Sequence, residues 1–104
     1  MANGKNGREL KRIRKEILLA LKVVYPAALQ AEPLLRSLLV LFPTLEFEQL
    51  KRDLHYLSQK GYVERAAAVE QNGDFTPWRH RWFRLTTHGM ELADQCIHDP
   101  ALEE

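Results

Sequence analysis

The apolar positions between residues 44 and 60 follow the period of a helix. They recur at intervals of three, four and three residues, in the order Phe47, Leu50, Leu54 and Leu57. A helix with about 3.6 residues per turn brings such positions to one face. Thr44 can cap the start of this helix, and Gly61 can take the left-handed conformation just after its end. The pattern therefore predicts a helix over residues 44–60 with one face in a core.

The opposite side of this helix is polar and has two interpretations. It carries side chains that can form hydrogen bonds or stack on a flat partner, with Leu45 among them near the start: Glu48, Gln49, Arg52, His55, Tyr56 and Gln59. One interpretation is a surface that reads a partner. The other is a solvated helix side with a Glu48–Arg52 pair at a spacing of four residues, which contributes only about 0.2–0.5 kcal/mol.

A first helix is expected over residues 8–24. Its shared apolar face consists of Leu10, Ile13, Ile17, Ala20, Leu21 and Val24. Leu19 and Val23 lie on the far side, so the second half of this helix needs a cover, either a C-terminal helix or a second subunit. Pro26 ends the helix, because proline cannot continue its hydrogen bonds, and residues 27–31 form a bridge.

A second helix opens at Glu32-Pro33, where proline suits the first turn and the carboxylate lies near the positive end of the helix dipole. This helix is expected to be short and largely buried, because it is strongly apolar: Leu34, Leu35, Leu38, Leu39, Leu41 and Phe42. Pro43-Thr44 closes it and gives a tight connection to the next helix.

A β-hairpin is expected after this helical region. Residues 62–69 and 78–85 are the predicted strands, and the Gln-Asn-Gly-Asp sequence of residues 71–74 suits a hairpin turn. In the second strand the side chains alternate between two faces, with Phe83 and Leu85 on one and Trp82 and Arg84 on the other. Trp78 and Trp82 are expected to pack the hairpin against the core in preference to stacking on a base or a partner.

A last helix is expected over residues 88–97. Thr86 or Thr87 can cap its start, and Asp99-Pro100 ends it. The chain then has a flexible tail, one folded domain and a C-terminal tail: residues 1–7, 8–98 and 99–104.

Composition limits the class of protein. A chain of 104 residues with 45% hydrophobic residues can bury a core as one domain. Cys96 is the only cysteine, so no internal disulfide is possible and a reducing compartment is expected. No apolar run approaches the roughly 20 residues of a membrane span, and no cleavage site of a signal peptide follows the basic N-terminus. We therefore expect a cytoplasmic protein that does not enter a membrane.

The charge is unevenly distributed although the net charge is only +1. Residues 1–16 contain six cations and two carboxylates, which gives +4 and leaves −3 for the rest of the chain. A second basic cluster consists of Arg79, Arg81 and Arg84. The predicted helix over residues 44–60 is neutral, so any binding to an anionic partner would depend on the flanking clusters.

Catalytic and metal-binding patterns are not found in the sequence. Cys96 and His98 are only two candidate ligands, and His55, His80 and His88 lack the spacing of a zinc site. There is no glycine-rich phosphate loop after a strand and no G-x-S-x-G. We expect a protein that is not an enzyme and that has no metal and no cofactor.

Two runs of the sequence resemble motifs of the winged-helix superfamily. One is Leu50-Lys-Arg-Asp-Leu-His-Tyr-Leu-Ser-Gln-Lys-Gly-Tyr-Val63, which resembles the L-x-x-x-L-x-x-L-x-x-x-G-x-v run of MarR-like and PadR-like winged helices. The other is Phe83-Arg-Leu-Thr-Thr-His-Gly-Met-Glu-Leu92, which resembles their y-x-L-T-x-x-G-x-x-L run. The order of three helices, a hairpin and a closing helix is similar too. More loosely, the chain resembles short winged-helix proteins encoded in Mu-like prophages.

The resemblance implies a mainly α-helical winged helix-turn-helix fold that binds double-stranded DNA, often in transcriptional regulation. The helix over residues 44–60 would lie in the major groove, and the hairpin over residues 62–85 would be the wing. The positions that match the reading face are Thr44, Leu45, Glu48, Gln49, Arg52 and Tyr56. Backbone or minor-groove contacts would come from Arg79, Arg81 and His80 near the wing, and from Lys11, Arg12 and Lys15 on the first helix.

Specific base contacts follow from the chemistry of these side chains. Gln49 suits adenine, Arg52 suits guanine, and Glu48 can accept a hydrogen bond from cytosine N4. The sequence departs from the usual pattern in its carboxylates, because Glu46, Glu48 and Asp53 lie on a helix that would face phosphates.

An alternative is a winged helix that binds another protein and not DNA, with Glu46, Glu48, Tyr56 and the tryptophans facing the partner. In the DNA-binding interpretation we expect a homodimer through Leu19, Val23 and the C-terminal helix.

Overall fold

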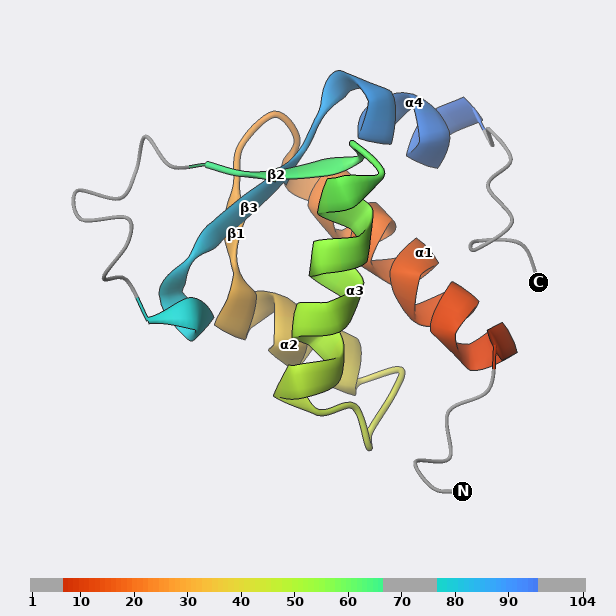
Figure 1. Cartoon of the computed structure of the whole chain (residues 1–104), viewed down its shortest axis with the longest axis vertical. Helices are drawn as coiled ribbons and strands as arrows, with labels where there is room; N and C mark the ends of the chain where they lie inside the picture. Colours follow the sequence, from red (N-terminus) through yellow and green to blue (C-terminus); the bar gives the residue numbers. More distant parts are fainter. Residues whose placement is uncertain (1–6, 67–76, 96–104) are drawn as a thin grey trace.

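The computed structural model describes residues 7–66 and 77–95 of the chain. Within these ranges the protein is mainly helical, with a small three-stranded antiparallel sheet (Figure 1). The elements in chain order are α1 (Gly7–Val24), β1 (Leu29–Gln30), α2 (Ala31–Leu39), α3 (Phe47–Gln59), β2 (Val63–Arg65), the 3-10 helix η3 (Trp78–His80), β3 (Trp82–Leu85) and α4 (Thr87–Gln95). No helix in the described part is long and apolar enough to cross a membrane.

The sheet contains a strand that the sequence did not indicate. The strand order is β1-β3-β2, so β3 pairs with both neighbours. Leu29 lies opposite Phe83, and Val63 lies opposite Leu85. The expected bridge between the first two helices therefore contains β1, which joins the sheet as an edge strand.

The core is formed by one face from each long element. The apolar face predicted for α3 is confirmed, because Leu50, Leu54 and Leu57 are fully buried. They pack with buried residues of the other elements: Ile13, Ile17, Leu18 and Leu21 of α1, Leu34 and Leu38 of α2, Phe83 and Leu85 of β3, and Leu92 of α4. The alternation predicted for the second hairpin strand is confirmed as well, because Phe83 and Leu85 are buried whereas Arg84 is exposed.

The turn between α2 and α3 differs from the expectation. The amides of Leu41 and Phe42 both donate to the Leu38 carbonyl, so the chain tightens and leaves the helix after Leu39. Phe42 then points into the core, whereas Val40 and Leu41 are 79% and 51% exposed. The prediction that Leu41 belongs to a buried helical face was wrong.

The start of α3 also differs from the expectation. Its N-cap position is Glu46, and Thr44 is an exposed residue of the preceding turn. The amide of Leu45 donates to the Phe42 carbonyl, and this turn places the Leu45 side chain in the core, only 5% exposed. The placement of Leu45 on the outer face was therefore wrong.

The hairpin strands are shorter than predicted. Residues 78–80 form η3 and not a strand, because the chain turns after Pro77 and the His80 amide donates to the Pro77 carbonyl. Several expectations lie outside the described residues: the strand beyond residue 66, the turn at residues 71–74, the tails over 1–6 and 99–104, and the helix end with Cys96.

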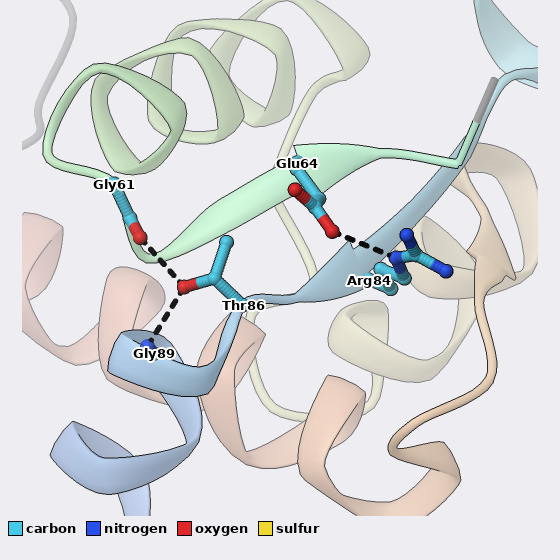
Figure 2. Close-up of polar contacts among 5 residues, drawn as sticks. All are labelled: Gly61, Glu64, Arg84, Thr86 and Gly89. Atoms are coloured by element: carbon cyan, nitrogen blue, oxygen red, sulfur yellow. Dashed lines mark hydrogen bonds and ion pairs between the residues drawn. The ribbon is translucent and has the colours of Figure 1, made fainter.

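Figure 2 shows the junction at which α3, β2, β3 and α4 meet. The Thr86 hydroxyl donates to the Gly61 carbonyl at 2.6 Å and accepts from the Gly89 amide at 3.0 Å. Thr86 thus caps α4, as predicted, and also ties it to the end of α3. Gly61 has the expected left-handed backbone, with φ of +84°. The Leu-Thr-x-x-Gly run therefore has a physical role in joining these elements.

Candidate nucleic-acid interface

The exposed side of α3 is a row of polar residues that we call the outer ridge: Glu48, Arg52, His55 and Gln59. In Figure 1, α3 crosses in front of α1 and α2, with β2 and β3 beside it. Its apolar face is held in the core, so the outer ridge points to solvent. Of the predicted base-reading residues, Glu48 and Arg52 belong to this row.

Two other predicted readers, Gln49 and Tyr56, face α1 instead. The Gln49 side-chain amide donates to Asp53 Oδ2 at 3.1 Å. Arg14 of α1 donates from Nε to Asp53 Oδ1 at 3.0 Å, and its guanidinium lies 4.0 Å from the centre of the Tyr56 ring. These side chains connect the two helices.

Asp53 is fully buried, so the expectation that its carboxylate would face phosphates was wrong. Burial raises the pKa of Asp53 above its ordinary value of 3.8. The hydrogen bonds from Gln49 and Arg14 and the positive charges of Arg14 and Arg52 lower this pKa and offset only part of the rise. The sequence alone gave no sign of this burial, because the partner Arg14 lies 39 residues away.

The base of the hairpin is attached to the first turns of α3 by aromatic contacts. The Trp78 and Phe47 rings form a T-shaped contact, with 5.0 Å between their centres. The Phe83 ring is tilted against Trp78, with 5.6 Å between the centres. The Arg79 guanidinium lies 5.5 Å from the Phe47 ring, and the Lys51 ammonium lies 5.7 Å from the Trp78 ring. The packing predicted for Trp78 is confirmed. These contacts bring the Arg79 cation to α3 and place it on the same side as Lys51 of that helix.

A groove of about 440 Å³ runs between α3 and the sheet, and we call it the wing-base groove. Its polar lining residues are Lys51, His55, Ser58, Glu64, Arg65 and Arg81, and its apolar ones are Leu54, Val63, Trp78 and Phe83. Among the described residues of this lining the one carboxylate is Glu64, which accepts from Arg84 at 2.8 Å (Figure 2). The described lining thus contains three cations, and one of them, Lys51, also lies 3.8 Å from the Glu48 carboxylate of the outer ridge.

Of the cations in this groove, Arg81 was predicted from the sequence, whereas Lys51 and Arg65 were not. A signal was present, because Lys51 follows Phe47 by four residues, which places both on the same side of α3 as the hairpin base.

The cations predicted on α1 lie on the other flank of α3. Arg12 is exposed, and its guanidinium lies 5.4 Å from the ring of Phe42 in the turn before α3. Lys15 is exposed and Lys11 is half-buried on the same helix. Arg12 and Arg79 therefore both approach the N-terminal end of α3, where the helix dipole adds positive potential.

Among residues 7–66 and 77–95, no three His, Cys, Asp or Glu side chains come together in a way that could hold a metal ion. Comparison of the chain with family models, with curated proteins and with solved structures gave no match.

Proposed function

We propose that this chain is a winged-helix protein that binds double-stranded DNA, with α3 in the major groove and the hairpin of β2 and β3 as the wing. The order of the elements supports this assignment, because three helices are followed by a hairpin and a closing helix. The strand β1 between α1 and α2 completes a three-stranded sheet with the hairpin. The junction built by Thr86 and Gly89 gives a structural reason for the run that resembles a winged-helix motif.

The observation that carries the proposal is the arrangement of cations around the N-terminal half of α3. Arg12 reaches Phe42, Arg79 reaches Phe47, and Lys51 reaches Trp78, so cations from three elements converge there. Each lies against an aromatic ring, which limits the freedom of its side chain. DNA presents phosphates on both sides of its major groove, and flanking cations suit that geometry.

Base recognition then falls to the outer ridge. Arg52 suits the O6 and N7 acceptors of guanine, and Glu48 suits the N4 donor of cytosine. His55 is an additional candidate, because it is exposed between the ridge and the wing-base groove. Gln49 and Tyr56 are assigned to the contact with α1.

The test is fluorescence anisotropy with a labelled pool of random-sequence duplexes at low salt. We expect binding that weakens steeply as salt rises, because phosphate contacts release counterions. The double substitution Arg52→Ala/Arg79→Ala should weaken it by about tenfold or more, since it removes two cations from the surface that would face the phosphates.

Lys22→Ala is the matched control for the loss of a cation. Lys22 pairs with Asp94 of α4 at 3.1 Å and lies in the last turn of α1, away from the outer ridge. This variant should bind the duplexes as the wild type does. If the wild type binds no duplex at low salt, or if Lys22→Ala weakens binding as much as the double substitution, the proposal fails.

A second candidate function is binding to another protein through the turn before α3. Val40 and Leu41 are large apolar side chains with much of their surface exposed, and they adjoin Phe42, on which Arg12 lies. Exposed apolar residues in one place are typical of a protein contact. The double substitution Val40→Ser/Leu41→Ser distinguishes the two candidates. It should abolish binding to a protein partner at this turn, and it should leave duplex binding unchanged.

A further inference from the structure

Asp53 is the single buried charged side chain in the described part of the chain. It lies in the middle of α3 and faces Arg14 from α1, with Gln49 and Arg52 as the neighbouring polar groups on its own helix. Winged-helix DNA binding as proposed above gives this carboxylate no direct task, because it has no access to solvent or to a ligand.

The energetics argue against a role in stability. Moving a carboxylate out of water costs several kcal/mol, and a buried ion pair is on that account weak evidence for stability. Burial is the largest influence on the pKa of Asp53 and raises it. The surrounding hydrogen-bond donors and positive charges therefore stabilise the charged carboxylate less than burial destabilises it. An apolar pair of similar size would fill the same space without this cost.

The geometry argues for a role in orientation. Arg14 reaches two residues on successive turns of α3, the Asp53 carboxylate at 3.0 Å and the Tyr56 ring at 4.0 Å. Asp53 in turn holds Gln49, so that one stripe of α3 is attached to α1 by directed contacts. The apolar contacts of α3 are not directional and allow a helix to roll, whereas hydrogen bonds have a narrow range of angles.

This attached stripe lies next to the outer ridge. Residues 49, 53 and 56 each follow a ridge residue, 48, 52 or 55, by one position. Successive residues are about 100° apart around a helix, so a roll of α3 moves both rows together. The contact with α1 therefore also determines where Arg52 and His55 point.

We propose that Arg14 and Asp53 are positioning residues, which fix the roll of α3 on α1 and thereby aim the outer ridge. The consequence for DNA rests on the proposed function, whereas the roll itself can be measured without DNA. On this proposal the pair orients α3 and is not needed for stability.

The test replaces the pair by apolar residues of similar size, Arg14→Met/Asp53→Leu. Net charge is unchanged, and methionine keeps a favourable contact with the Tyr56 ring. We expect a midpoint of urea unfolding equal to or above that of the wild type. Binding to the random duplex pool should fall by about tenfold or more, because a rolled α3 moves the Arg52 cation away from the DNA. Residual dipolar couplings of backbone amides should show α3 rolled relative to α1.

Two further variants complete the design. Lys22→Met/Asp94→Leu removes another ion pair between helices, of Lys22 with Asp94 of α4, and should leave duplex binding and the roll of α3 unchanged. Asp53→Asn keeps an oxygen for Arg14, and Gln49 can turn its amide to accept from the new side chain. This conservative variant should bind duplexes nearly as the wild type does and keep its dipolar couplings.

The outcomes separate the two proposals. If the wild type binds duplexes and Arg14→Met/Asp53→Leu binds them equally well with unchanged couplings, the positioning role is overturned. A double variant that is unfolded or much less stable also overturns it, because the pair would then serve stability. If the wild type binds no duplex, the proposed function fails, and the dipolar couplings alone decide the positioning role.

Discussion

Two glycines at the junction of Figure 2 are needed for different reasons. Gly61 has a positive φ of +84°, which side chains with a Cβ rarely adopt. Gly89 lies where α4 passes over the backbone of residue 62, and a Cβ there would overlap with the Tyr62 carbonyl. That carbonyl accepts from the Thr86 amide, so it cannot move without loosening the end of β3.

Gly89→Ala should therefore destabilise the protein. The extra methyl group meets backbone atoms and not a flexible side chain, so we expect the free energy of unfolding to fall by about 1–3 kcal/mol. Urea unfolding followed by circular dichroism measures this change. Gly7→Ala is the control, because a Cβ at Gly7 meets open space. An equal decrease in the free energy of unfolding in both variants would contradict the overlap at Gly89.

Asp53 gives a prediction about pH. Its pKa is raised in the folded state by burial, so the folded protein holds a proton on this group more readily than the unfolded chain does. Stability from this protonation is present at low pH and is lost as pH rises through the folded-state pKa. Asp53→Asn cannot ionise and avoids the loss. The variant should thus gain on the wild type as pH rises from about 4 to about 7.

The measurement is the difference in unfolding free energy between Asp53→Asn and the wild type across that pH range. The contributions of the other titratable groups are the same in both proteins and cancel in this difference. The difference should be small below pH 3.8, the ordinary pKa, and should level off above the folded-state pKa. A difference that shrinks as pH rises would mean that Arg14 and Gln49 outweigh burial and lower the pKa of Asp53.

At the scale of elements, the sequence predicted what is encoded locally. The apolar period of α3, its end at Gly61 and the cap at Thr86 each depend on neighbours within a few residues, and all are confirmed. The strand β1 was missed because two residues carry no alternation, and Leu29 becomes a strand residue only by pairing with Phe83. The inward turn of Gln49 was missed for the same kind of reason, since it depends on Asp53 and Arg14 together.

The contact between η3 and α3 attaches the base of the hairpin to the proposed DNA interface. Trp78 lies between Phe47 and Phe83 and next to Lys51. Trp78→Ala should lower the free energy of unfolding by about 2 kcal/mol, less than the 3–5 kcal/mol for a fully buried aromatic ring. Duplex binding should weaken beyond this loss of stability, because Lys51 loses the ring beside its ammonium group and η3 loses the packing that holds Arg79 near α3.

Trp78→Phe is the matched variant, because it keeps an aromatic ring between Phe47 and Phe83. It should restore most of the stability and the duplex affinity, as measured by urea unfolding and by anisotropy. Wild-type affinity in a folded Trp78→Ala variant would show that the wing base does not position the cations.

At the scale of the whole molecule, the positive charge that could attract DNA is small. The net charge is +1, and the cations that approach α3 come from α1, η3 and α3 itself. A second subunit would double these contacts and would place two α3 helices on successive half-sites. The predicted homodimer therefore bears directly on the affinity that a short chain can reach.

The proposed contact of this dimer is the second half of α1. Val23 is 83% exposed, whereas Leu19 is half-buried and α4 packs against the same helix through Lys22 and Asp94. Part of the cover predicted for α1 is thus supplied by α4, and Val23 remains as the exposed centre of the contact. A carboxylate placed there would be buried without a partner in the dimer, at a cost of several kcal/mol.

Val23→Glu should accordingly shift the sedimentation mass from two chains to one and weaken duplex binding. Val40→Glu is the control, because Val40 is equally apolar and 79% exposed but lies in the turn between α2 and α3. It should sediment as the wild type does. A wild type that sediments as one chain at high concentration removes the dimer, and a loss of the dimer in Val40→Glu alone moves the contact to the turn before α3.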